Sequence, residues 1–181
     1  MPQSRTRTMV VASLVAALIA VGAFVSVPVG AVPITLQMFA VVLAALLLSS
    51  GGAFAATSVY VLLGAVGVPV FAGGKAGLAV LFGPTGGFLL GFVVGAIAGA
   101  EVRQFLHGRV PTVVADGFAA AVVIASVYLL GWAQLVVVTD MSPVAAFAAG
   151  VAPFLVFDAL KAVAAVAFAT AIRRARAIPA A

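Results

Sequence analysis

Long apolar runs, separated by short polar breaks or breaks rich in glycine and proline, follow one another along this chain of 181 residues. Several runs reach or approach the roughly 20 residues that an α-helix needs to cross a bilayer. They are continuously apolar rather than alternating, which favours helices over the strands of a membrane barrel. The pattern predicts an all-α membrane protein, a single domain over residues 1–181, with six transmembrane helices at about 9–29, 36–48, 53–68, 86–106, 117–138 and 153–172.

The breaks between these runs predict loops of unequal size. Two prolines and a glycine interrupt residues 27–37, and a glycine-rich segment occupies residues 69–85. A connection as long as the second is more often functional than idle in a compact bundle. The Gly-Gly-Lys at residues 73–75 lacks the spacing of a phosphate-binding loop, so we find no nucleotide-hydrolysis motif. We predict a short amphipathic or re-entrant helix over residues 144–152, before the last span.

The composition agrees with the apolar pattern. Hydrophobic residues make up 66% of the chain and charged residues only 7%, whereas soluble domains average about 45–50% and about 25%. The chain has no cysteine, which excludes disulfides, a thiolate nucleophile and a cysteine metal site. The single histidine, His107, has no cluster of possible co-ligands near it in the sequence and is predicted to be an exposed loop residue.

The positive charges predict the orientation in the membrane. With both termini in the cytoplasm, the inner segments carry Arg5, Arg7, Arg103, Arg109, Arg173, Arg174 and Arg176, and the outer segments carry only Lys75. This asymmetry follows the positive-inside rule. Because the charges lie at helix ends, the net charge of +5 indicates lipid head groups and cytoplasmic loops rather than nucleic acid. Asp116 is predicted to cap the N-terminus of the fifth span.

One acid and one base stand inside the last apolar span. Asp158 and Lys161 are three residues apart, so a helix places them on one face, about 4.5 Å apart along its axis. A charge at the centre of a membrane helix costs about 3 kcal/mol, and such groups usually face the bundle interior and mark a substrate or ion path. The alternative is an ion pair that neutralises itself and only holds helices together. Asp158 lies about 7.5 Å along the helix from Pro153, which predicts a pocket opening to the exterior beneath the outer loops.

Other segments offer side chains that could complete this pocket. The Asp158 carboxylate can accept N–H groups of an amide or urea, and Lys161 or Lys75 can face a ligand carboxylate or screen Asp158. Neutral polar groups and aromatic walls could come from Thr35, Gln37, Tyr60, Phe71, Phe82 and Phe88. The combination predicts a small, partly apolar metabolite with one acidic end and one polar cyclic or amide end.

Small residues recur along the first span. Ala12, Ala16 and Ala20 are spaced every four residues and would form a smooth ridge on one helix face. Such ridges let two membrane helices approach closely. The alternative is that an alanine-rich composition produces the spacing by chance.

Four stretches, taken together, resemble the BioY family, the biotin-specific substrate-binding (S) components of energy-coupling factor (ECF) transporters. They are P-I-T-L-Q (33–37), Y-V-L-L-G-A-V-G-V-P-V-F (60–71), G-P-T-G-G-F-L-L-G-F (83–92) and P-F-L-V-F-D-A-L-K-A (153–162). The resemblance implies a six-helix S-component fold in the cytoplasmic membrane that captures biotin from outside. It also implies a membrane scaffold subunit (EcfT/BioN-like) and two ABC ATPases (EcfA/BioM-like) as partners, with no catalysis by this chain.

The resemblance further implies roles for individual residues. Asp158 would bind the ureido ring of biotin, Lys161 would belong to the same polar cluster, and the loops at 69–84 and around Gln37 would cover the ligand. The implied biotin-binding set is Thr35, Gln37, Tyr60, Phe71, Lys75, Thr85, Phe88, Asp158 and Lys161, with no metal and no cofactor. The ridge of Ala12, Ala16 and Ala20 resembles the face by which S components dock on the scaffold.

The chain departs from the family pattern at two positions. Family members often have glycine where this chain has Phe157 and tyrosine where it has Phe88. Alternative functions are an S component for another small carboxylated vitamin, a structural membrane subunit, and a membrane enzyme. The last would need a nucleophile, a metal cluster or an acid–base dyad near a substrate.

Overall fold

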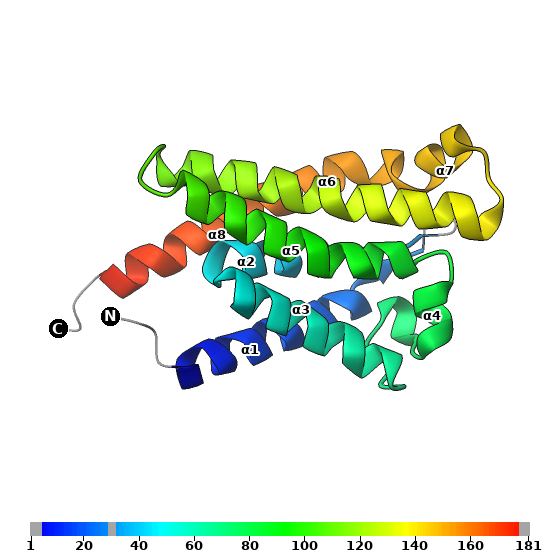
Figure 1. Cartoon of the computed structure of the whole chain (residues 1–181), viewed down its shortest axis with the longest axis horizontal. Coiled ribbons are helices and arrows are strands. Elements are labelled where there is room, and N and C mark those ends of the chain that lie inside the picture. Colours follow the sequence, from blue (N-terminus) through cyan, green and yellow to red (C-terminus); the bar gives the residue numbers. More distant parts are fainter. Residues whose placement is uncertain (1–4, 29–31, 178–181) are drawn as a thin grey trace.

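Helices make up most of the computed structural model, which describes residues 5–28 and 32–177 (Figure 1). Two short strands, β1 (Ser26–Val27) and β2 (Ile34–Thr35), form an antiparallel hairpin between the first two helices. The six main helices are α1 (Arg5–Phe24), α2 (Gln37–Leu47), α3 (Ser50–Ala65), α5 (Gly86–Leu106), α6 (Thr112–Thr139) and α8 (Leu155–Ala177). The shorter elements are η1 (Ala72–Gly74), α4 (Leu78–Phe82), α7 (Pro143–Gly150) and η2 (Ala152–Phe154). The predicted all-α class is confirmed, and the six main helices follow the order of the six predicted spans.

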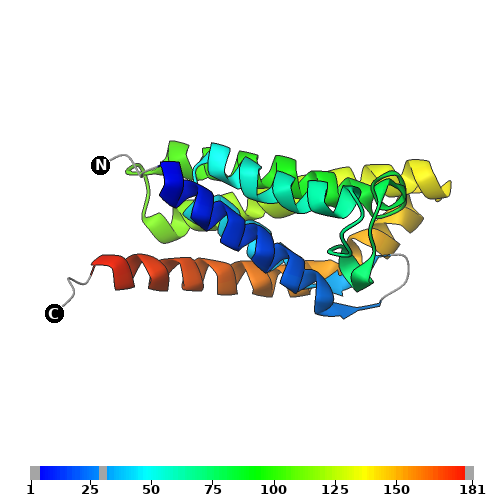
Figure 2. The same ribbon diagram turned by 90° about the horizontal axis from the view of Figure 1, so that it is seen from below.

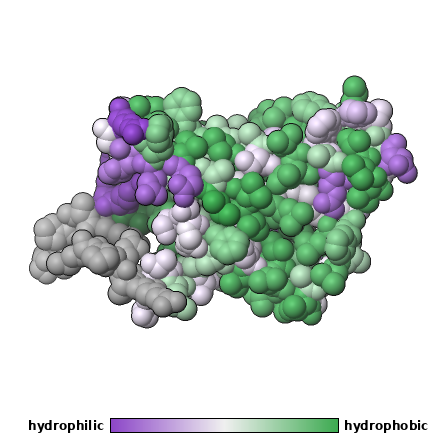
Figure 3. Space-filling model, in the orientation of Figure 1, coloured by the Kyte–Doolittle hydropathy of each residue, from purple (hydrophilic) through white to green (hydrophobic). Residues whose placement is uncertain are grey.

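The outer surface of the bundle is apolar. Large hydrophobic side chains such as Leu14, Phe54, Leu62, Phe118 and Leu129 are more than half exposed. Figure 3 shows this apolar surface between more polar ends. By length and composition, three helical stretches can each cross a membrane: Gly86–Leu106, Thr112–Thr139 and Pro143–Ala175, the last including α7. The chain is therefore a multi-pass membrane protein.

The apolar parts of the other three helices, Thr8–Phe24, Gln37–Leu47 and Ser50–Ala65, are shorter than a full span. Helix α2 lies at the core of the bundle. Its 11 residues fall short of the ~20 that a transmembrane helix needs. Nine of the ten residues from Gln37 to Leu46 are buried, because α1, α5, α6 and α8 pack around this helix. A helix that is buried all round can be apolar on every face.

Most predicted helix boundaries differ from the observed ones by a few residues. The first helix ends at Phe24, because the chain then enters the hairpin, and predicted position 29 lies outside the described residues. The fifth main helix begins at Thr112 with Pro111 as its N-cap. The prediction that Asp116 caps this helix is therefore wrong, since Asp116 lies inside it. The segment 69–85 was predicted as a loop but contains helix α4.

Glycines allow α5 and α6 to pack backbone against backbone. Gly87, Gly91, Gly95 and Gly99 recur every four residues on α5 and all lie against α6. A Cβ on Gly91 would come within 2.7 Å of the Val127 Cα. This closeness is typical of small-residue interfaces between membrane helices, where packing rather than water exclusion drives association.

We expect Gly91→Ala to lower the free energy of unfolding by about 1–3 kcal/mol, because overpacking a tight contact forces backbone shifts. Gly117→Ala is the matched control, since a Cβ on Gly117 in α6 would meet nothing within 4 Å. Thermal unfolding in detergent, followed by circular dichroism, compares the two. Equal melting temperatures for both variants would contradict the close α5–α6 packing.

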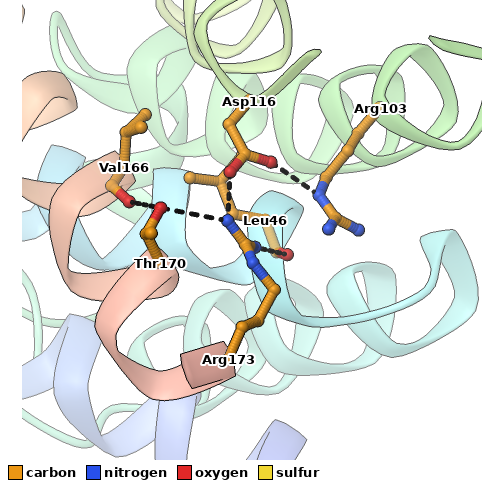
Figure 4. A network of polar contacts seen from close by, with 6 residues as sticks. All are labelled: Leu46, Arg103, Asp116, Val166, Thr170 and Arg173. Atoms are coloured by element: carbon orange, nitrogen blue, oxygen red, sulfur yellow. Dashed lines mark hydrogen bonds and ion pairs between the residues drawn. The ribbon is translucent and has the colours of Figure 1, made fainter. Parts of the chain in front are cut away.

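A buried carboxylate joins four helices at one end of the bundle (Figure 4). Asp116 on α6 is fully buried and accepts a hydrogen bond from Arg103 Nε on α5 at 2.8 Å. Its other oxygen accepts from the Arg173 guanidinium on α8. The same guanidinium donates to the Leu46 carbonyl near the end of α2 at 3.5 Å. The network thus ties α2, α5, α6 and α8 together.

The two ends of the bundle differ in what they carry. The α5–α6 turn and the terminal ends of α1 and α8 lie at one end, and α4, α7 and the hairpin lie at the other (Figures 1 and 2). His107 is exposed at the first end, as predicted. The hairpin, the 69–85 segment and the connection between α6 and α8, which six spans with both termini in the cytoplasm would place outside the cell, therefore do lie at one end of the bundle. Which side each end faces stays a prediction.

Candidate functional site

A pocket lies at the end of the bundle that carries α4 and the hairpin. It encloses about 710 Å³ of empty space, its open mouth included. Its lining comes from segments far apart in the sequence: Val32, Pro33, Thr35, Gln37, Met38, Phe71, Ala72, Lys75, Val80, Thr85, Phe88, Leu89, Phe92, Val127, Tyr128, Phe154, Asp158 and Lys161.

The acid of the last helix is buried in the pocket wall with two partners. Asp158 stands in the first turn of α8 and is only 4% exposed. Its Oδ1 accepts from Lys161 Nζ at 2.7 Å, one turn further along α8. Its Oδ2 accepts from the hydroxyl of Tyr128 on α6 at 2.8 Å. A carboxylate offers about four lone-pair positions, so this one can still accept N–H groups of a ligand.

A second polar group comes from the start of α2. Gln37 is 3% exposed, and its side-chain amide donates to the Tyr60 hydroxyl while its Oε1 accepts from the Thr35 hydroxyl at 3.1 Å. Tyr60 is fully buried on α3 and does not line the pocket. It therefore lies behind the wall and fixes the orientation of the Gln37 amide.

Two aromatic walls lie against glycines. A Cβ on Gly131 of α6 would come within 2.3 Å of the Phe88 ring, and a Cβ on Gly64 of α3 within 2.1 Å of the Phe71 ring. Phe71 also meets the Tyr60 ring edge to face, with ring centroids 5.7 Å apart. Both rings occupy space that a side chain at Gly131 or Gly64 would fill, so the shape of the pocket depends on these two glycines.

The segment between α3 and α5 covers the pocket. Phe71 pairs with Lys75 across η1 in a short bridge, and α4 follows. The Gln134 side chain on α6 donates to the carbonyls of Leu81 and Gly83 at 2.8 and 2.7 Å, which attaches this cover to the bundle. Lys75 forms no ion pair within the described part of the chain and is exposed. Since Lys161 balances Asp158, the pocket as a whole is positive and suits a monoanionic ligand.

The structure brings most of the predicted site residues together. Thr35, Gln37, Phe71, Lys75, Thr85, Phe88, Asp158 and Lys161 all line the pocket, whereas Tyr60 lies behind it. Phe82, also expected as a wall, is 76% exposed and does not line it. Phe157 is 49% exposed on the outer surface, so this departure from the family pattern does not alter the lining.

Sequence reasoning missed several lining residues, above all Tyr128, Phe92 and Phe154. Phe92 and Phe154 carry no signal, because phenylalanine is common in any apolar helix. Tyr128 does carry one: a buried tyrosine hydroxyl usually finds a hydrogen-bond partner, so a tyrosine in the middle of an apolar run indicates a polar neighbour.

The alanine ridge does not form the expected docking face. Ala12 and Ala16 are 6% and 4% exposed and belong to the core, and Ala20 is partly buried against it. Helix α1 uses this ridge to pack on α2 and α3, and it exposes Ser13 and Ala17 instead. The prediction that Ala12, Ala16 and Ala20 contact a scaffold subunit is corrected accordingly.

The pocket presents a small set of polar groups. Its one carboxylate is hydrogen-bonded to a lysine and a tyrosine. His107 is the C-cap residue of α5, in the α5–α6 turn at the opposite end of the bundle. Within residues 5–28 and 32–177, no group of three His, Cys, Asp or Glu side chains could hold a metal ion. The arrangement offers hydrogen-bond acceptors and donors beside apolar walls and one ammonium at the mouth.

Comparison with known proteins gives consistent results over nearly the whole chain. The model of the BioY family matches residues 1–178. The chain is similar to the biotin transporter BioY2 of Lactococcus lactis, with 37% identity over 97% of this chain and 94% of that protein. It is 41% identical to the biotin transporter BioY of Thermotoga maritima, over 93% of this chain and 96% of that one. A crystal structure of the S-component for biotin from an ECF-type ABC transporter shares its fold, with a TM-score of 0.87 at 20% identity over 96% and 94% of the two chains.

Proposed function

Because the chain belongs to the BioY family, we propose that it is the S component of an ECF-type ABC transporter that captures biotin for uptake across the cytoplasmic membrane. The observation that carries this proposal is the buried Asp158, which accepts hydrogen bonds from Lys161 and Tyr128 in the wall of a pocket that Phe71 and Phe88 also line. Biotin has a ureido ring with two N–H donors, a thioether ring and a short carboxylate tail. These groups match a carboxylate acceptor, aromatic walls and a lysine at the mouth.

The proposed placement puts the ureido ring at Asp158 and the carboxylate tail near Lys75. The apolar ring would lie between Phe71 and Phe88, and the cover formed by residues 69–85 would close above it. The proposed entry is from outside the cell, since the positive-inside pattern places the opposite end of the bundle in the cytoplasm.

The proposed partners are a membrane scaffold subunit (EcfT/BioN-like) and two ABC ATPases (EcfA/BioM-like). Their ATP hydrolysis would drive release of biotin inward, which agrees with the lack of a nucleotide motif in this sequence. Copurification from native membranes tests this assembly, because it reports the partners and any bound ligand together.

Direct binding tests the ligand. We expect purified wild-type protein to bind labelled biotin saturably, and desthiobiotin, which keeps the ureido ring, to compete. Lipoate has a similar carboxylate tail but no ureido group, so we expect it not to compete at comparable concentrations. Absence of saturable biotin binding would refute the proposal, and equal competition by lipoate would point to an S component for another carboxylated vitamin.

A further inference from the structure

The Asp158 carboxylate is held from two helices at once. Lys161 holds Oδ1 from the same helix, and Tyr128 holds Oδ2 from α6. The two donors thus engage different oxygens, at 2.7 and 2.8 Å. Rotation of the carboxylate about its Cβ–Cγ bond would break both hydrogen bonds.

The tyrosine is the more rigid of the two donors. Lysine ends in a compact ammonium on a flexible four-carbon side chain. Tyr128 has a stiff ring that is 9% exposed, and its helix packs tightly on α5 through the glycine contacts at Gly91 and Gly95. The tyrosine is also neutral, so it orients the carboxylate without cancelling its charge.

We propose that Tyr128 is a positioning residue for ligand capture: its hydroxyl holds Asp158 so that the remaining lone pairs of the carboxylate face the pocket and accept N–H groups of the ligand. The proposal rests on the proposed function for the identity of the ligand, but the clamp on Asp158 can be tested without any ligand. Asp158 makes the polar contact, and Tyr128 acts through it.

A double-mutant cycle tests the role in binding. We expect Tyr128→Phe to weaken biotin binding about tenfold or more in the wild-type background, because a hydrogen bond to a charged group is lost. In the Asp158→Asn background the same change should weaken binding less than about threefold, since no carboxylate remains to be positioned. Equal factors in the two backgrounds would overturn the proposal, as would no effect in the wild type.

The second tyrosine is the matched control. The chain has only two tyrosines, and the hydroxyl of Tyr60 accepts a hydrogen bond from Gln37 and does not contact Asp158. Any effect of Tyr60→Phe on binding should therefore be the same factor with and without Asp158→Asn. The contrast between the two tyrosines separates coupling to Asp158 from a general loss of a buried hydroxyl.

Infrared spectroscopy of ligand-free protein gives an independent readout. The chain has only three aspartates, Asp116, Asp140 and Asp158, so ¹³C-labelling of aspartate and subtraction of the Asp158→Asn spectrum isolates the carboxylate bands of Asp158. We expect Tyr128→Phe to shift these bands and Tyr60→Phe to leave them in place. Unshifted bands in Tyr128→Phe would refute the clamp. A shift in protein that does not bind biotin would support the clamp while refuting the proposed ligand.

Should Tyr128→Phe fail to fold, 3-fluorotyrosine keeps the test open. Incorporated into the Tyr60→Phe variant, it labels only position 128 and makes that phenol a stronger hydrogen-bond donor. We expect the Asp158 bands to shift in the direction of a stronger hydrogen bond. Bands identical to those of unlabelled Tyr60→Phe would overturn the proposal.

Discussion

Replacing Asp158 with asparagine is expected to weaken biotin binding by about 2–4 kcal/mol, or roughly 30- to 1,000-fold. The change removes one acceptor oxygen and turns an NH₂ group toward the ligand donors or toward Lys161. It also leaves the Lys161 ammonium, whose side chain is 12% exposed, without its counter-charge. Equilibrium binding of labelled biotin to purified protein measures the loss.

Asp140→Asn is the matched control for this prediction. Asp140 is exposed at the C-cap of α6 and does not line the pocket, so the same chemical change there should leave the affinity within about twofold. Unchanged affinity in Asp158→Asn, with wild-type binding intact, would refute the assignment of Asp158 to the binding site.

The double variant Asp158→Asn with Lys161→Met separates binding from packing. Removing both charges avoids the unpaired buried ammonium, so thermal stability should recover relative to Asp158→Asn alone. We expect biotin binding to remain weak, because the acceptor is still missing. A double variant that is stable and binds biotin like the wild type would favour the alternative that the pair only holds helices together.

The sequence predicted the parts of the fold that depend on local pattern. Run length and continuous apolarity gave the number and order of the main helices, since each depends only on neighbouring residues. The same pattern cannot say which face of an apolar helix is inside, because lipid and protein interior select the same residue types. Ala12 and Ala16 were therefore predicted to form an outer docking ridge, although they pack inside the bundle.

Some residues of the site could likewise be predicted from local sequence, whereas others could not. Asp158 and Lys161 stand out in a single sequence because two charges in one apolar span are costly. Tyr128 gains its role only from the packing of α6 on α8, 30 residues away along the chain. Asp116 was predicted to be a helix cap because it stands just before an apolar run. Its actual partners, Arg103 and Arg173, are 13 and 57 residues away in the sequence. Pairings over such separations leave no trace in local spacing.

Removing the carboxylate of Asp116 should destabilise the whole bundle without touching the pocket. Asp116 is fully buried, and it is the only acid that pairs with the two guanidiniums within the described residues. Loss of one partner from a buried ion pair typically costs about 3–5 kcal/mol, because the charge that remains is left uncompensated. We expect Asp116→Asn to lower the free energy of unfolding by this amount, measured by thermal unfolding of ligand-free protein in detergent.

Glu101→Gln is the matched control, because Glu101 is exposed on α5 and forms no ion pair among the described residues. It should leave the melting temperature close to that of the wild type. Since Asp116 is absent from the pocket lining, the Asp116→Asn protein that remains folded should bind biotin with wild-type affinity. The two changes therefore differ in their expected effect on affinity: Asp116→Asn lowers stability and spares affinity, whereas Asp158→Asn lowers affinity through a lost ligand contact. A fall in affinity with unchanged stability in Asp116→Asn would contradict the structural role of this network and would place it in the path of ligand capture instead.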